Sequence, residues 1–197
     1  MINYIVIGNS GVGKSSFINN YIGKQVAKTG KYEETTNDIK RYTKKSKNIS
    51  LIDLPGLNFQ QDSQTRSEVE QRDIAYLRKL IEVTKQFTIH GIIYVTAFHP
   101  RLSSAERETL RLIAKELPNH YWKNSRIVFT RCAGRLDTLG SDKFESAVQA
   151  RLQEITDYLK KENKNFSSFE RIIVVDNVNF NWHDNARVIS ECLDEKI

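Results

Sequence analysis

The chain has 197 residues, of which 39% are hydrophobic and 27% are charged, and its formal net charge is +6. This composition is ordinary for a globular protein and excludes disorder as a description of the whole chain. The longest apolar run, residues 91–98, is of strand length, so the sequence predicts no transmembrane segment. The two cysteines, Cys132 and Cys192, form no CxxC pair, which favours a reducing, cytoplasmic setting, with a peripheral position at a membrane as the alternative.

Strand-length apolar runs alternate with amphipathic helical stretches along the chain. This alternation predicts an α/β fold with a mostly parallel six-stranded sheet, one antiparallel edge strand and helices on both faces. We expect one domain over residues 1–197, with no linker or internal repeat. The expected strands are 2–7, 39–43, 49–53, 91–97, 126–130 and 171–176, and the expected helices are 14–22, 65–87, 103–117, 141–161 and 184–194.

The densest group of basic residues lies in the hairpin that joins the second and third expected strands. We interpret it as the solvated end of that hairpin, and a membrane or nucleic-acid footprint is the alternative. Since nothing else in the sequence indicates a nucleic-acid site, we expect no nucleic-acid partner. The group consists of Lys40, Arg41, Lys44, Lys45 and Lys47.

The loop after the first strand matches the GxxxxGK[ST] phosphate-binding motif without a mismatch. Its glycines allow a tight turn that directs successive N–H groups at a β-phosphate, and the following helix adds its positive end. We expect Lys14 to reach the β- and γ-phosphates and the Ser15 hydroxyl to bind Mg²⁺. The predicted nucleotide-binding residues of this segment are Asn9, Ser10, Gly11, Val12, Gly13, Lys14, Ser15 and Ser16.

A second motif, DxxG, closes the third expected strand, 38 residues after Ser15. An unpaired carboxylate at the end of an apolar strand is costly, and a Mg²⁺-bound water at Asp53 would explain it. Gly56 supplies an N–H that can contact a γ-phosphate. Between the two motifs, Thr36 is the best candidate for the threonine of a first switch loop that binds Mg²⁺, with Thr35 as the alternative. Threonines that merely open a strand are the other interpretation.

Together these motifs are similar to those of Ras-like G domains. A narrower resemblance joins the chain to the GIMAP-type immunity-associated GTPases and to the GTPases of plastid outer-envelope import receptors. It covers nearly the full chain, with Leu102 in place of an aromatic residue and Ser103 in place of threonine. The segments that carry it are 8–15, 53–58, 90–96, 100–106 and 127–131.

The resemblance implies a Mg²⁺-dependent protein that binds GTP and GDP and forms homodimers across the nucleotide face. Arg101 falls in the segment that matches the arginine box of GIMAP-type proteins. It is therefore a candidate catalytic arginine that reaches into a partner's site. The alternative is an arginine that satisfies local carbonyls or pairs with an acidic neighbour.

The base-recognition loop departs from the usual pattern. G domains read guanine with [NT]KxD, but here the tetrad starts at Thr130 and Arg131 and ends at Ala133, where the aspartate is expected. Asp176 and Asn177, at the end of the last expected strand, resemble the acidic–Asn pair of the import-receptor relatives and are the predicted substitute. Arg131 would cover the base with its aliphatic stem, or remain a solvent-exposed loop arginine.

Two functions fit this set of residues. The first is a GTPase in which Lys14, Thr36, Gly56 and Arg101 serve catalysis and Ser15, Thr36 and Asp53 hold Mg²⁺. The second is a nucleotide-controlled switch or assembly scaffold with negligible hydrolysis. Leu57 stands where Ras-like enzymes carry a water-orienting glutamine, so we expect slow intrinsic turnover. A P-loop kinase of small molecules is a weaker third interpretation.

Overall fold

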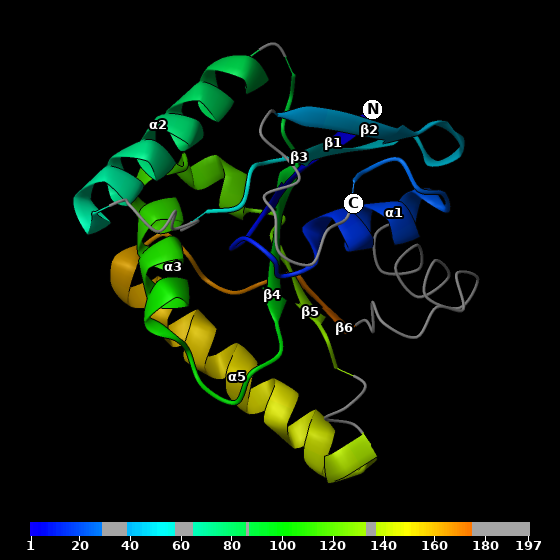
Figure 1. Ribbon diagram of the computed structural model, residues 1–197, viewed down its shortest axis with the longest axis vertical. Coiled ribbons are helices and arrows are strands. Elements are labelled where there is room, and N and C mark those ends of the chain that lie inside the picture. The colour runs from blue at the N-terminus through cyan, green and yellow to red at the C-terminus, as the bar shows by residue number, and fades with distance from the viewer. Residues whose placement is uncertain (29–38, 58–64, 86, 133–136, 175–197) are drawn as a thin grey trace.

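The computed structural model describes residues 1–28, 39–57, 65–85, 87–132 and 137–174. In these ranges one six-stranded sheet has the order β2-β3-β1-β4-β5-β6, and Figure 1 shows the helices beside it. β2 pairs antiparallel with β3 and the other neighbours pair parallel, so a mostly parallel sheet with an antiparallel edge strand is confirmed. The strands are β1 (Ile2–Ile7), β2 (Lys40–Lys44), β3 (Ile49–Asp53), β4 (Gly91–Ala97), β5 (Arg126–Thr130) and β6 (Arg171–Val174).

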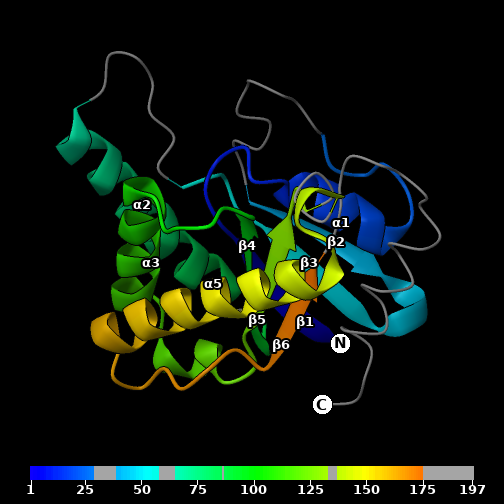
Figure 2. The same ribbon diagram turned by 90° about the horizontal axis from the view of Figure 1, so that it is seen from below.

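Helices cover both faces of the sheet, as predicted, but not equally (Figure 2). Among the described residues, α1 alone covers one face, and three helices cover the other. The helices are α1 (Lys14–Ile22), α2 (Arg66–Thr84), α3 (Ser104–Glu116) and α5 (Ser141–Glu162). None of the helices in the described ranges is both long enough and apolar enough to cross a membrane.

Strand residues alternate between two apolar layers because successive side chains point to opposite faces. Tyr4 and Val6 of β1 pack with the apolar side of α1, which buries Phe17, Ile18 and Tyr21. The neighbouring Ile5 and Ile7 belong to the larger layer under α2, α3 and α5. This larger layer is the main core of the protein. It includes Leu77, Leu80, Leu110, Ile113, Val148, Ile155 and Leu159 from the three helices.

Capping boxes set the starts of two helices. Ser103 caps α3 and exchanges hydrogen bonds with Glu106, three residues further along the chain. Thr65 caps α2 in the same way with Glu68. The expected helix 65–87 ends earlier, at Thr84, where the Lys85 N–H donates to the Glu82 carbonyl in a tighter final turn.

Other element bounds differ slightly from the expected ones. The β2–β3 connection contains a short 3-10 helix (Lys45–Lys47), and Asn48 closes it with a φ of 56°. β2 extends to Lys44 because its pairing with Ile49 of β3 continues to the turn. A second 3-10 helix (Asn119–Trp122) precedes β5. The expected helix 184–194 lies outside the described residues.

Candidate functional site

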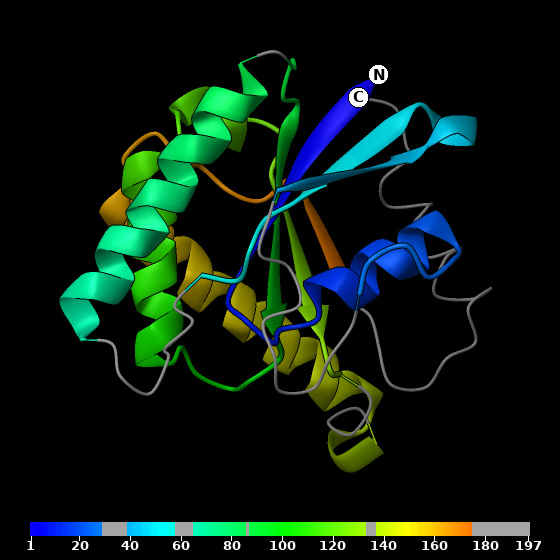
Figure 3. The ribbon, with the colours of Figure 1, turned by 45° about the horizontal axis from the view of Figure 1, so that its top comes forward.

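The loop that joins β1 to α1 carries the GxxxxGK[ST] motif and lies at the carboxyl end of the parallel strands (Figure 3). Gly13 is the residue before α1, and its φ of 96° is a left-handed conformation that side chains disfavour. Gly13 gives α1 no side-chain cap. The N–H groups in the first turn of a helix and the helix dipole favour an anion.

Lys14, the first residue of α1, is buried, with 7% of its surface exposed. Its Nζ donates to the Gly8 carbonyl at 3.1 Å and to the Asn9 carbonyl at 2.9 Å. These two bonds hold the ammonium over the β1–α1 loop, where it would contact a phosphate bound by that loop. α1 is fixed below by its buried apolar face, so the cation sits on a rigid support.

The DxxG turn lies directly beside this loop. β1 and β3 pair in a register that aligns Val6 with Asp53, whose side chain is fully buried. Beyond the strands, the Leu57 N–H donates to the Gly8 carbonyl and the Ser10 N–H donates to the Leu57 carbonyl, both at 3.2 Å. Main-chain bonds thus tie the two motifs together.

Glycine is required at position 56 by this close approach. A Cβ on Gly56 would lie 2.5 Å from the Cα of Ser10, closer than real Cβ contacts come. The next side chain, Leu57, is buried in the main core. Leu57 therefore acts as a packing residue, and its main chain, rather than its side chain, contributes to the site.

The residues present fit a magnesium–phosphate ligand. Ser15 lies in the first turn of α1 beside Lys14, and Asp53 ends the strand that pairs with β1. A hydroxyl and a carboxylate are oxygen donors of the kind that Mg²⁺ prefers. Burial and the nearby Asp53 carboxylate raise the pKa of Tyr42 on β2.

The Thr130–Arg131 segment at the end of β5 is fastened to the phosphate loop. The buried Thr130 hydroxyl lies 2.6 Å from the Val12 carbonyl and 3.3 Å from the Thr96 carbonyl. The Arg131 guanidinium donates to the Gly11 carbonyl at 2.6 Å. The backbone of Arg131 itself is left-handed, with a φ of 59°. Arg131 is exposed, but this bond holds it on the phosphate loop. The sequence suggests instead that Arg131 covers the base or is a solvent-exposed loop arginine.

Several predicted site residues fall outside the described ranges. They are Thr36 and its alternative Thr35, the substituted position Ala133, and the proposed base readers Asp176 and Asn177. The predicted Val12, Ser15 and Ser16 are each partly exposed around the loop. The structure thus brings together the phosphate loop, the DxxG turn and the Thr130–Arg131 segment.

Arg101 lies in the connection between β4 and α3 and is exposed. No hydrogen bond or ion pair joins its side chain to another residue of the described ranges. The neighbouring Leu102, by contrast, is buried in the main core. The connection therefore presents an arginine to solvent from a firmly anchored main chain.

Sequence reasoning missed two features of this region. One is the main-chain bridge between Ser10 and Leu57, for which the sequence has no signal. The other is Arg151 of α5, which is fully buried and pairs with Glu106. A signal for Arg151 was present, since it interrupts an apolar stripe of α5 that contains Val148 and Ile155.

The family model described as 50S ribosome-binding GTPase matches residues 3–130, which is more than half of the chain. The chain belongs to this GTPase family. The match covers the phosphate loop, the DxxG turn and Thr130, the three parts that the structure assembles. The P-loop G-domain assignment and its Ras-like α/β fold are therefore confirmed.

Two curated relatives match parts of the chain. Translocase of chloroplast 159 from Arabidopsis thaliana is 29% identical over 140 residues, which are 67% of this chain and 9% of the relative. A probable GTP-binding protein EngB from Christiangramia forsetii is 38% identical over 88 residues, which are 44% of each chain. The matched regions thus span less than half of either relative.

Solved structures of Toc33 from Arabidopsis thaliana have the same fold. The chain covers 85% of a dimerisation-deficient Toc33 mutant with a TM-score of 0.68, and 99% of this chain is matched at 16% identity. Toc33 in complex with Mg²⁺ and GMPPNP matches 98% of this chain with a TM-score of 0.62 and 17% identity, again over 85% of that chain. The resemblance to plastid import-receptor GTPases is confirmed.

Proposed function

We propose that residues 1–197 form one G domain that binds GTP and GDP with Mg²⁺ and hydrolyses GTP, slowly as a monomer and faster as a homodimer. The observation that carries this proposal is the main-chain bridge between the phosphate loop and the DxxG turn, with buried Lys14 beside it. Through this bridge, two segments that are far apart in sequence form one continuous lining of the phosphate site, as binding of a nucleoside triphosphate requires.

Each residue has a defined task in this site. Loop N–H groups and Lys14 would bind the β- and γ-phosphates and offset their negative charge. Ser15, Thr36 and Asp53 would hold Mg²⁺, which neutralises charge on the phosphate oxygens when it is bound. The N–H of Gly56 would contact the γ-phosphate. Because phosphoryl transfer depends mainly on positioning and charge, these groups suffice for slow turnover.

Guanine recognition is assigned to Asp176 and Asn177, because Ala133 replaces the usual aspartate. A carboxylate accepts from the two guanine donors, whereas adenine would leave it unpaired. Thr130 and Arg131 hold the base loop on the phosphate loop through their bonds to Val12 and Gly11.

Faster turnover needs a group that the monomer lacks, since Leu57 is buried in the core and cannot orient water. The exposed Arg101 supplies it in a second copy of the chain that docks on the nucleotide face. We therefore expect a cytoplasmic homodimer, with peripheral membrane attachment as the alternative location. The other candidate function is a switch with negligible hydrolysis, which the burial of Leu57 also favours.

Phosphate release measured at rising protein concentration tests this function. We expect the specific activity to increase with concentration, and GTP-loaded protein to dimerise more than GDP-loaded protein. Arg101→Ala should flatten the increase while GTP affinity stays unchanged, whereas Arg66→Ala, which removes another exposed arginine, should behave as the parent. Turnover that is independent of concentration contradicts dimer activation, and absence of turnover at every concentration favours the switch.

A further inference from the structure

The Arg101 loop, defined as residues 98–103 between β4 and α3, donates hydrogen bonds from three of its main-chain N–H groups to three different elements. The Phe98 N–H donates to the Thr130 carbonyl of β5 at 2.8 Å. The Leu102 N–H donates to the Glu154 carboxylate of α5 at 3.1 Å, and the Ser103 N–H donates to Glu106 of α3 at 3.0 Å. Arg101 lies between these anchors, so its position depends on them.

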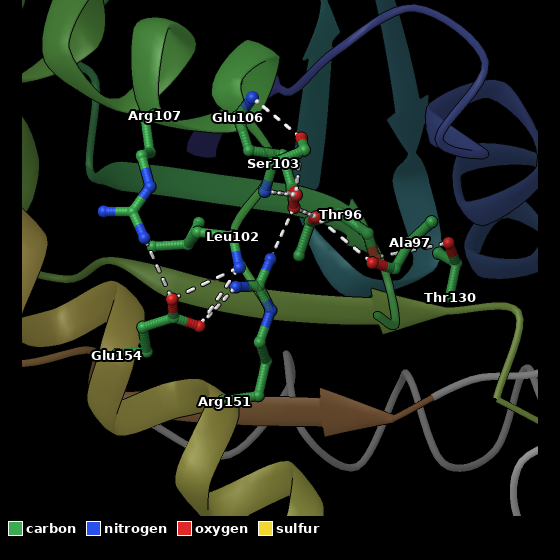
Figure 4. Close-up of polar contacts among 9 residues, drawn as sticks. All are labelled: Thr96, Ala97, Leu102, Ser103, Glu106, Arg107, Thr130, Arg151 and Glu154. Atoms are coloured by element: carbon green, nitrogen blue, oxygen red, sulfur yellow. Dashed lines mark hydrogen bonds and ion pairs between the residues drawn. The ribbon is translucent and has the colours of Figure 1, made fainter. Parts of the chain in front are cut away.

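Behind the loop is a buried network of charges (Figure 4). Arg151 donates from Nη2 to Glu106 at 2.7 Å and from Nη1 to Glu154 at 2.9 Å. Its side chain is fully buried, while that of Glu154 is 32% exposed. A buried arginine between two carboxylates is costly to desolvate and adds little stability over an apolar group of equal size. This cost indicates a role other than stability.

Glu106 is the centre of this network. Its carboxylate accepts from Arg151, from Ser103 and, at 2.7 Å, from the Thr96 hydroxyl at the end of β4. Burial opposes its ionisation, but the bonds from Thr96 and Ser103 and the charge of Arg151 outweigh burial and lower the pKa of Glu106. Glu106 is therefore ionised near neutral pH.

The network also reaches the nucleotide end of the site. The Thr130 hydroxyl lies within hydrogen-bond distance of both the Thr96 and Val12 carbonyls, so one chain of contacts joins α5, α3, β4 and the phosphate loop. Glu154, on α5, lies away from the phosphate loop and accepts a hydrogen bond from Leu102 of the Arg101 loop.

We propose that Glu154, itself oriented by Arg151, is a positioning residue that fixes Arg101 for delivery into a partner's nucleotide site. It acts through the Leu102 N–H and touches neither nucleotide nor metal. This role rests on the proposed dimer-activated GTPase. It adds a specific residue of α5, remote in sequence from every G-domain motif of this chain, on which activation depends.

Three variants of the full chain test the proposal. Glu154→Ala removes the acceptor of the Leu102 N–H and leaves Arg151 paired with Glu106. Glu154→Gln keeps an amide oxygen that can accept the same N–H. Arg107→Ala is the control, because it removes a further side-chain partner of Glu154, at 3.2 Å, and keeps the main-chain bond from residue 107 to Ser103.

Two readouts separate positioning from a general loss of structure. The first is phosphate release against protein concentration, with GTP affinity measured separately in dilute protein. The second is hydrogen exchange of the Leu102 amide, which reports local opening. For Glu154→Ala we expect faster exchange at Leu102, unchanged GTP affinity, and a concentration-dependent rate lowered about tenfold to 10²-fold, the scale of a misplaced catalytic group.

We expect Glu154→Gln to recover most of the rate, and Arg107→Ala to match the parent. A Glu154→Ala protein that keeps the parent's concentration-dependent rate overturns the proposal, as does unchanged exchange at Leu102. If the parent protein binds no GTP, or if its specific activity does not change with protein concentration, the proposed function itself is refuted. The two failures are distinguishable because the second appears in the parent and the first only in the variants.

Discussion

The phosphate end and the arginine end of this site are built by different means. The phosphate end, residues 8–15 and 53–57, is assembled from main-chain groups: Leu57 exchanges bonds with Gly8 and Ser10, and a Cβ on Gly56 would collide with Ser10. The arginine end, the Arg101 loop with its supports, is held largely by side chains, among them Glu106 and Glu154. Thr130 joins the two ends through its contacts with Val12, Thr96 and Phe98.

The difference shows what each end depends on. A main-chain lining needs glycines at particular positions and carries its own sequence motif. A side-chain network needs residues that meet only after the sheet and helices have formed. Substitutions at the phosphate end should therefore change ligand affinity, whereas those at the arginine end should change stability and activation.

The largest effect on affinity should come from Lys14→Ala. Loss of a charged donor to two phosphates should weaken GTP binding about 10³-fold, at roughly 1.5–3 kcal/mol for each charged hydrogen bond. The fold should persist, because the Lys14 ammonium donates to the Gly8 and Asn9 carbonyls of the phosphate loop and Lys14 belongs to neither apolar layer. Fluorescent-nucleotide titration measures the change, with exposed Lys24→Ala as the charge-matched control. A folded Lys14→Ala protein with the parent's affinity refutes the assignment of the phosphate end.

Arg151→Met should have the largest effect at the arginine end. It leaves Glu106 buried without its cation, which should lower the free energy of unfolding by about 3–5 kcal/mol. Urea denaturation at neutral pH measures this change. Adding Glu106→Gln to Arg151→Met should restore part of the loss, because the uncompensated charge disappears.

Arg66→Ala is the control for that change. Arg66 pairs with Glu108 at 3.3 Å, but its side chain is 80% exposed, so the cost should stay below about 1 kcal/mol. If Arg151→Met costs no more than this control, the loss of Arg151 does not leave an uncompensated buried charge on Glu106.

Base selection should respond less strongly. Asp176→Ala should reduce the preference for GTP over ATP about tenfold or more, since one charged hydrogen bond to guanine contributes roughly 1.5–3 kcal/mol. Competition titrations with both nucleotides measure the ratio. Asp157→Ala, an exposed substitution on α5, is the matched control. Full guanine preference in Asp176→Ala would mean that another group reads the base.

The smallest effect is a pH dependence at the arginine end. Because the folded pKa of Glu106 is lowered, its ionised form contributes stability above the unfolded pKa of about 4.3 and loses it as pH falls through the folded pKa. The unfolding free energy of the parent should therefore fall more steeply than that of Glu106→Gln in acid. Denaturation series at neutral pH and at successively lower pH values compare the two slopes; equal slopes would show that Glu106 does not titrate as proposed.

The predictability of the two ends follows from their construction. Lys14 and Gly56 could be placed from local motifs, and the α3 capping box could be placed from Ser103 and Glu106 alone. The sheet followed from strand-length apolar runs, which specify both faces through alternation. Arg151 could not be assigned a partner from sequence, because Glu106 lies 45 residues away and meets it only through the packing of α3 on α5.

Leu57 shows a second limit of prediction from sequence, at the phosphate end of the site. Sequence comparison with Ras-like enzymes treats it as a catalytic position that has lost its glutamine. In the structure its side chain belongs to the main core, and its N–H and carbonyl join the two phosphate motifs. A residue's main-chain role carries no side-chain signature, so the sequence does not reveal it.

Calorimetric titration of the full chain with GTP and ATP, in the presence and absence of Mg²⁺, tests the central claim most directly. We predict one site per chain, GTP affinity at least about tenfold above that of ATP, as one charged contact to guanine provides, and weaker GTP binding without Mg²⁺. Equal affinities for GTP and ATP would contradict guanine specificity, and absence of triphosphate binding would contradict the nucleotide site as a whole.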